Sequence, residues 1–466
     1  MGTATNLELA QENKMGTKPI GRLLIEISLP MCFSMLVYAC YNIIDSIFVS
    51  RIGEQALTAV SIAFSVQNLM VAVAVGTGVG INSLVSKRLG EKRFKEANEA
   101  AMNGFFLALC SSVVFTLLGF FIAPYYFKTQ TQDTLVLQYG CDYLKIVMIF
   151  CFGLFFEITA GRILLSTGKT FYSMIAQIIG SVVNIILDPL LIFGIGFFPK
   201  MGIVGAAVAT VIGQIFGLFF ALFFILTIDH EISLSLKGFR PSIKIISKIY
   251  KVGLPSILLA SIGSVTIYCF NLILKTFSDT AVAFLGIYFK LQSFVLLPVL
   301  GLNNGIVSIV AYNYGAKKPE RIMDTIRMGV IIGFACTLVG FVIIAATPEL
   351  ILMPFNPTPT MKQIAVPGMR IIATHFLLAS ISITFGSIFQ ALGNGLLSMI
   401  ISFVRQLVVL VPIAYLLSLT KNIDLVWLSF PFAEIFSLAL SSIFMIYSYK
   451  HYIKPLYSQK ENISLQ

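Results

Sequence analysis

The stretch GSVVNIILDP, residues 180–189, lies inside an apolar run that extends from about residue 171 to residue 198. A run of this length is sufficient for a helix that crosses a lipid bilayer. Asn184 and Asp188 are four residues apart, so a helix places both side chains on one face. A carboxylate inside a membrane costs about 2.5–3.5 kcal/mol on insertion scales and normally faces a partner or a water-filled cavity. The stretch therefore predicts a membrane fold with a functional site at Asp188, the alternative being an Asp188 solvated near the membrane surface.

The composition of the whole chain indicates an integral membrane protein. Of the 466 residues, 57% are hydrophobic and 11% are charged, whereas soluble domains carry about 25% charged residues. The formal net charge of +11 would suit nucleic acid, but Lys and Arg are confined to short segments between apolar runs, so no nucleic-acid partner is expected. The seven cysteines show no CxxC motif and the three histidines are scattered, which predicts neither disulfides nor a His-based metal site.

Twelve apolar runs are long enough to span a membrane. The predicted spans are 24–49, 56–85, 100–123, 137–160, 171–198, 202–228, 252–274, 281–311, 325–346, 366–391, 396–419 and 424–448. Both tails, the loop after the second span, the central link and the loop after the eighth span are rich in Lys and Arg, whereas several intervening loops carry a single one. By the positive-inside rule, we expect a multi-pass protein of the cell inner (plasma) membrane with both termini in the cytoplasm.

An internal repeat divides the chain into two halves. One constant spacing separates the members of each of the following pairs: Pro30 and Pro255, Gly90 and Gly315, Gly168 and Gly393. Six spans is an even number, so both halves enter the membrane in the same direction and leave a cleft between two bundles. We expect an all-α integral membrane fold with about twelve transmembrane helices in two pseudo-symmetric six-helix bundles. The predicted parts are a cytoplasmic tail at 1–20, an N-terminal bundle at 21–228, a cytoplasmic linker at 229–250, a C-terminal bundle at 251–450 and a cytoplasmic tail at 451–466.

Ionisable residues inside the spans are the candidates for a transport site. Asp45 in the first span follows Asn42 by three residues, so the first and fifth spans each carry an Asp with an Asn nearby. Two carboxylates that converge in one bundle repel each other and favour a bound proton or cation, which is the chemistry of an antiporter. The positions that match Asp45 and Asp188 in the second half of the repeat hold Phe270 and Ile413. The fold does not require the acids in both halves, which indicates ion coupling in the first half.

Other charged residues within spans allow two interpretations each. Glu157 is either a cavity carboxylate that attracts organic cations or an intrahelical partner of Arg162, five residues on. Lys290 and Arg405 either extend to the membrane surface or face the cleft. Glu434 is a candidate for the wall of a cavity in the second half.

Motifs of enzymes and of ATP-driven pumps are missing. The sequence STGKT at 166–170 resembles the end of a nucleotide-binding loop, but the glycine required five residues before Gly168 is Ile163. We found no HExxH motif, no nucleophile elbow and no TVGYG-type filter. We therefore expect no enzyme activity and no cofactor other than H⁺ or Na⁺ as the coupling ion.

Several segments together resemble the MATE (multidrug and toxic compound extrusion) family. They are LPMCFSMLVYACYNIIDSIFVSRIG at 29–53, LGEKRFKEA at 89–97, and NIILDPLLIFG at 184–194 followed by MGIVGAAVAT at 201–210. The likeness extends over about residues 20–450 and is greatest to the DinF-like bacterial branch, which includes MepA-type exporters. It implies a V-shaped protein of two bundles that exchanges Na⁺ or H⁺ for cationic, amphipathic drugs.

The resemblance also implies site residues. The cation-coupling residues would be Asp45, Asn184, Asp188 and Thr210, and Na⁺, if it is the coupling ion, would bind at the first three. The candidate substrate contacts are Tyr41, Asn42, Glu157, Asn271 and Glu434. The chain departs from the NorM-like branch, because Asn271 stands near the expected seventh-span acid and only His375 and Gln390 stand near the expected tenth-span acid.

Three functions are compatible with these features. The first is a secondary antiporter that exports small organic cations, with membrane lipid around it and no obligatory protein partner. The second is a flippase for a lipid-linked saccharide, which would need several Arg residues facing the cleft. The third is a channel or a receptor. The sequence shows neither a filter motif nor a ligand-binding ectodomain that would support it.

Overall fold

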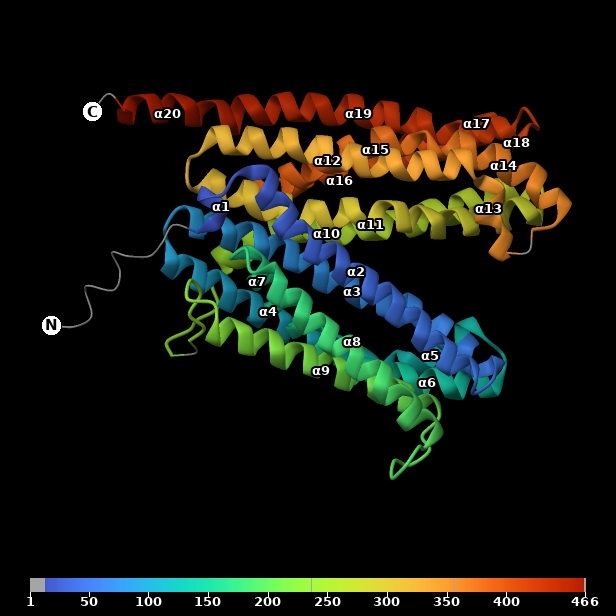
Figure 1. Cartoon of the computed structure of the whole chain (residues 1–466). Coiled ribbons are helices and arrows are strands. Elements are labelled where there is room, and N and C mark those ends of the chain that lie inside the picture. The colour runs from blue at the N-terminus through green and yellow to red at the C-terminus, as the bar shows by residue number, and fades with distance from the viewer. Residues whose placement is uncertain (1–12, 236, 356, 465–466) are drawn as a thin grey trace.

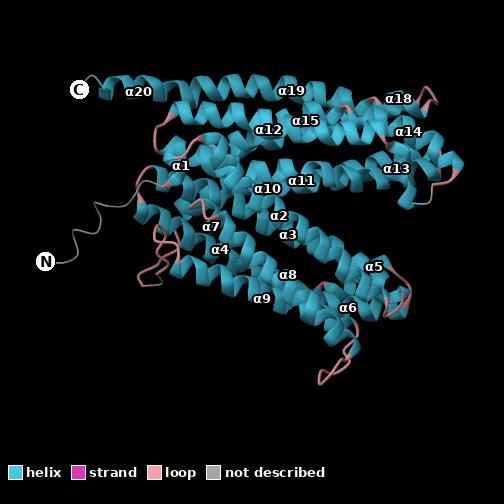
Figure 2. Ribbon diagram, viewed as in Figure 1, coloured by secondary structure: helices cyan, strands magenta, loops and turns pink. Residues whose placement is uncertain are grey.

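The computed structural model describes residues 13–235, 237–355 and 357–464, and this part of the chain contains helices and loops but no β-strand (Figure 2). The helices form two lobes that lie side by side in a V (Figure 1). The lobes meet at the end of the molecule where α1 (Lys14–Thr17) and α20 (Lys454–Ser464) lie, which we call the terminal end. They diverge toward the opposite end.

The first half of the chain forms the N lobe. Its helices are α2 (Ile20–Ser50), α3 (Glu54–Gly90), α4 (Phe94–Phe121), α5 (Ala123–Gln130), α6 (Thr134–Ile149), α7 (Phe152–Ser166), α8 (Thr170–Phe193) and α9 (Ile203–Thr227). Residue chemistry explains several helix ends. The side chain of Asp133 caps α6 by accepting hydrogen bonds from the backbone of Leu135 and Val136, and Gly194, at a φ of 72°, ends α8 in the left-handed conformation.

The second half forms the C lobe. Its helices are α10 (Ile243–Lys275), α11 (Asp279–Gly315), α12 (Pro319–Ala346), α13 (Pro348–Leu352), the 3₁₀ turn η1 (Met353–Phe355), α14 (Pro359–Ala373), α15 (His375–Ala391), α16 (Gly395–Phe403), the π-helix η2 (Val404–Leu410), α17 (Val411–Ser418), α18 (Ile423–Trp427), α19 (Ser429–Ser448) and the π-helix η3 (Tyr449–Ile453). Of the predicted linker 229–250, the described residues up to 242 are non-helical, and the rest form the first turns of α10.

The predicted all-α membrane fold is confirmed. Within the described residues, ten helices are long and apolar enough to cross a membrane. The pairs α6–α7 and α14–α15 are bent by 47° and 42°, and they bring the number of spans to twelve if each pair counts as one.

Glycines bring the two lobes into backbone contact near the terminal end. A Cβ atom on Gly90 would lie 1.9 Å from the carbonyl oxygen of Tyr312, and one on Gly315 would lie 2.1 Å from that of Lys87. Lys87 and Tyr312 have the same sequence separation as the two glycines, so the two contacts are equivalent under the repeat. Only glycine permits helices to approach so closely.

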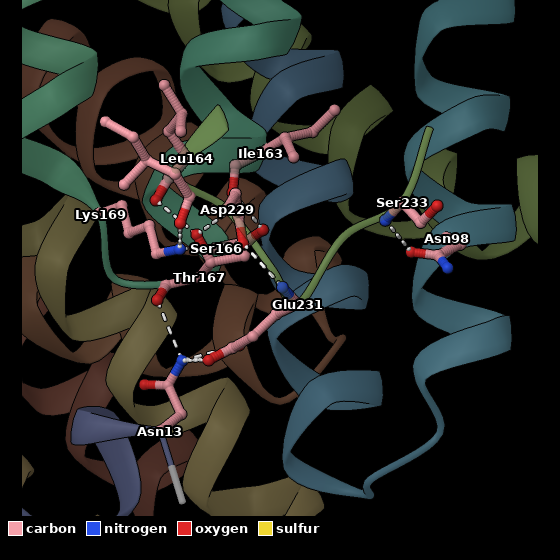
Figure 3. Close-up of polar contacts among 11 residues, drawn as sticks. Asn13, Asn98, Ile163, Leu164, Ser166, Thr167, Lys169, Asp229, Glu231 and Ser233 are labelled. Atoms are coloured by element: carbon pink, nitrogen blue, oxygen red, sulfur yellow. Dashed lines mark hydrogen bonds and ion pairs between the residues drawn. The ribbon is translucent and has the colours of Figure 1, made fainter. Parts of the chain in front are cut away.

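A polar network joins the N-terminal segment to both lobes at the terminal end. The amide of Asn13 donates hydrogen bonds to both carboxylate oxygens of Glu231, at 2.7 and 2.8 Å, and to the Thr167 carbonyl at 3.0 Å (Figure 3). In the same figure, Asp229 accepts a hydrogen bond from the Thr167 hydroxyl at 2.7 Å and pairs with Lys169 at 3.3 Å. These contacts attach the segment that follows α9 to the α7–α8 turn.

The C lobe holds the same N-terminal segment through its backbone. Asn313 and Arg321 both donate to the carbonyl oxygen of Met15, at 2.9 and 3.0 Å. The Met15 side chain is fully buried in the core cluster at the terminal end, to which both lobes contribute. Residues 13–18 therefore bridge the lobes and help to close this end.

We predict that Gly90→Ala and Gly315→Ala each lower the melting temperature of the detergent-solubilised protein. An added Cβ atom would overlap a backbone carbonyl group, and overpacking of this kind costs about 1–3 kcal/mol. The matched control is Gly286→Ala in α11, because no described atom beyond its chain neighbours and the adjacent backbone of its own helix lies within 4 Å of the position that its Cβ would take. Equal melting temperatures for all four proteins would contradict the assigned role of these glycines.

Candidate functional site

A cavity of about 760 Å³ lies between the lobes and is lined by residues of both. Its volume suits a drug-sized molecule. The N lobe contributes residues of α2, α3, α7, α8 and α9, and the C lobe contributes residues of α10, α11, α15, η2 and α19. Much of the wall is apolar, with Phe64, Phe289 and Phe430 among its residues.

The structure brings Asp45 of α2 and Asp188 of α8 together. The two carboxyl groups lie close enough to interact electrostatically, and the residues are 6% and 0% exposed. The alternative of a solvated Asp188 is therefore wrong. Among the described residues, Oδ1 of Asp45 and both carboxylate oxygens of Asp188 have no hydrogen-bond donor. A buried acid pair without a donor needs a proton or a cation between its oxygens, because two bare carboxylates would repel each other.

Asn184, one helical turn before Asp188 on α8, and Thr210 of α9 lie at the cavity wall. The Asn184 amide donates to the Thr210 hydroxyl at 3.4 Å, and both residues line the cavity. Asp45 and Asp188 are not among the lining residues, so they lie behind this part of the wall. Oxygen atoms of carboxylates, amides and hydroxyls are the ligands of hard cations. The structure thus pairs Asp45 with Asp188 and Asn184 with Thr210, and the oxygen atoms of these residues are of the kind that holds Na⁺ or a shared proton.

The predicted substrate contacts are distributed unevenly. Tyr41, Asn42, Glu157 and Glu434 line the cavity. Asn271 is not among the lining residues and is partly exposed on α10. The structure therefore does not bring Asn271 to the other candidates.

Glu157 and Arg162 do not pair with each other. Within the described part of the chain, Glu157 has no ion pair, whereas Arg162 donates a hydrogen bond to the Asn304 side chain of α11 at 2.6 Å. The interpretation of Glu157 as an intrahelical partner is wrong, and the cavity interpretation fits its position.

Charges on the C-lobe side of the cavity neutralise each other. Arg405, in the π-helix η2, forms an ion pair with Glu434 of α19 at 2.7 Å. His375 is buried at the cavity wall, with its Nε2 atom 3.4 Å from the Tyr288 hydroxyl. Lys290 is exposed and is not among the cavity residues. Because Arg405 lines the cavity and pairs with Glu434 there, the structure favours the interpretation in which Arg405 faces the cleft.

Side-chain amides form a large part of the polar wall, and the sequence reasoning missed them. These residues are Gln67, Asn68, Gln177, Gln214, Gln292, Asn304 and Gln406. They could have been found as uncharged polar residues inside predicted spans, but that signal alone does not say which helical face meets the cleft.

Comparison with known proteins adds independent findings. The MatE family model matches residues 30–190 and 254–416, one segment in each half of the chain. The multidrug export protein MepA of Staphylococcus haemolyticus is 26% identical over 434 residues, which cover 93% of this chain and 94% of MepA. A protein named FAD transporter from Shewanella oneidensis is 24% identical over 422 residues, covering 90% and 92% of the two chains.

A solved structure shares the fold. It shows a MATE-family multidrug resistance transporter of the MOP superfamily in an outward-facing conformation, and it superimposes with a TM-score of 0.87 at 24% identity. The superposition covers 96% of this chain and 99% of that one. The V-shaped arrangement of two bundles is therefore shared over almost the whole chain.

We predict non-additive effects of substitutions in the Arg405–Glu434 pair. Glu434→Gln leaves the Arg405 guanidinium without its carboxylate, and breaking a buried pair costs about 3–5 kcal/mol, although partial exposure of Arg405 lowers that figure. Removing both charges with Arg405→Gln and Glu434→Gln should therefore cost less than the sum of the single changes. Melting temperatures in detergent for all four proteins give this comparison, and additive losses would contradict the pairing.

Proposed function

Because the chain belongs to the MatE family, we propose that it is a secondary active multidrug efflux transporter. It exchanges H⁺ or Na⁺ for cationic amphipathic compounds by alternating access. The observation that carries this proposal is the buried pair of Asp45 and Asp188 beside a cavity between two lobes. No cofactor besides the coupling ion is required.

In the proposed cycle, the coupling ion and the cationic cargo bind to different carboxylates of the N lobe. A proton or Na⁺ that enters the pair of Asp45 and Asp188 neutralises it. Asn184 lies one helical turn before Asp188 and lines the cavity together with Thr210, so rearrangement at the acids would change the wall that a substrate touches. Glu157 offers a carboxylate directly to a cationic cargo.

The proposed orientation places the terminal end in the cytoplasm. The Lys- and Arg-rich segments lie in the two tails and in the loops at this end. The lobes are in contact here and diverge toward the other end (Figure 1), which corresponds to an outward-open state in the inner membrane. Rocking of one lobe against the other would open the terminal end.

A flippase for an anionic lipid-linked saccharide is not favoured. Such a cargo needs a cationic cavity, whereas the lining residues here include only two arginines, Arg162 and Arg405. Glu434 neutralises one of them. The cargo we propose is instead a small amphiphile that carries a cationic group, with no protein or nucleic-acid partner.

We predict that Asp45→Asn and Asp188→Asn each abolish gradient-driven efflux while the melting temperature stays near that of the wild type. An amide has almost the same shape as a carboxylate but holds neither a proton nor Na⁺ with the same strength. The measurement is ethidium efflux from proteoliposomes with proton and Na⁺ gradients imposed separately.

The matched control is Glu54→Gln, which removes an exposed carboxylate from the first turn of α3, outside the cavity and the acid pair. This variant should transport like the wild type. Full transport by both Asp variants would disprove the coupling role, and transport by the wild type that responds to neither gradient would disprove the antiporter.

A further inference from the structure

Two opposite charges on α7 face the cavity without neutralising each other. Glu157 and Arg162 both line the cavity, five residues apart, which corresponds to about 7.5 Å along a helix axis at about 1.5 Å per residue. In the described part of the chain, Glu157 has no hydrogen bond or ion pair, and the hydrogen-bond partner of Arg162 is the uncharged Asn304. A carboxylate and a guanidinium in one apolar cavity thus both lack an ionic partner.

The neighbouring helices leave room for both side chains at glycines. A Cβ atom on Gly217 of α9 would lie 2.5 Å from Oε1 of Glu157, and one on Gly78 of α3 would lie 2.7 Å from Cγ of Arg162. Each charged side chain therefore rests on a backbone surface that any larger residue would obstruct. Such support holds a binding group in one position before its ligand arrives.

The remaining charged groups near the cavity are already committed. Arg405 and Glu434 pair with each other, and Asp45 and Asp188 lie behind the wall as one unit. An occupant of the cavity therefore meets one available anion, Glu157, and one available cation, Arg162. Charges that are taken out of water without a partner are costly, so a ligand that carries both complementary charges offsets more of that cost than a simple cation.

We propose that the preferred substrates are zwitterionic amphiphiles, which place a cationic group at Glu157 and a carboxylate or similar oxyanion at Arg162. This inference rests on the proposed function and specifies its substrate class. A guanidinium group binds a carboxylate with two parallel hydrogen bonds. Because Asn304 belongs to the C lobe, an anion that replaces it on Arg162 also removes a contact between the lobes. Binding of the anionic group thereby favours separation of the lobes where Arg162 and Asn304 meet.

A pair of dyes provides the test. One is a rhodamine with a free carboxylate, and the other is the methyl ester of the same dye, which is a simple cation. Binding to the purified full-length protein is measured by fluorescence anisotropy. We expect the wild type to bind the carboxylate dye about tenfold more tightly than the ester, which corresponds to about 1.4 kcal/mol, because only the carboxylate dye forms charge-assisted hydrogen bonds with Arg162.

Variants separate the two halves of the site. Arg162→Gln should abolish the preference for the carboxylate dye over the ester, whereas Arg162→Lys should keep part of the preference. Glu157→Gln should weaken binding of both dyes. The matched control, Arg51→Gln, removes an exposed arginine that is not among the cavity residues and should behave like the wild type.

The inference fails if the wild type binds both dyes equally, prefers the ester or binds neither dye. It also fails if Arg162→Gln weakens both dyes to the same degree. Failure of the proposed function has a different signature. In that case, neither dye is exported by wild-type proteoliposomes under a proton or Na⁺ gradient, whatever the binding preference.

Discussion

The close approach of helices at the terminal end is the constraint on which the rest of the molecule depends. Gly90 and Gly315 each place their backbone against a carbonyl group of the other lobe. Because the lobes touch so closely at this end and diverge at the other (Figure 1), a cavity remains between them. Helices in lipid gain nothing from simply burying apolar surface, so close packing at small residues supplies the attraction. The same contacts must separate if the terminal end opens.

The two lobes share a repeat but differ in how they use charge. In the C lobe, Glu434 neutralises Arg405, so neither charge on this side of the cavity lacks an ionic partner. The N lobe keeps an acid pair without a donor and two cavity residues without ionic partners. Buried charges without a partner of opposite charge are costly, so the position of these groups in the N lobe is consistent with the ion and substrate sites that we propose there.

The fold was largely predictable from the sequence, whereas the partners of charged residues were not. Apolar runs and the constant spacing between paired glycines are properties of the chain itself, so they predicted the spans and both bundles. Asp45 and Asp188 were predicted together because each is a rare acid with a nearby Asn. The contacts of Arg162 with Asn304 and of Arg405 with Glu434 depend on how distant helices face each other. Asn271 shows the same limit, because its span was predicted correctly but its side chain is not among the cavity residues.

One face of α11 carries both a cavity residue, Asn304, and contacts between the lobes toward the terminal end. Gly301 and Gly305 pack against Cys32 and Ser28 of α2, and between them Asn304 accepts the hydrogen bond from Arg162. One turn further on, the Ser308 hydroxyl of the same helix donates to the Asn82 side chain of α3 at 3.1 Å. A change in the partner of Arg162 therefore acts on a helix face that holds both lobes together. Because these contacts are contiguous, they offer a direct physical route by which the proposed anion at Arg162 would act on the closure of the terminal end.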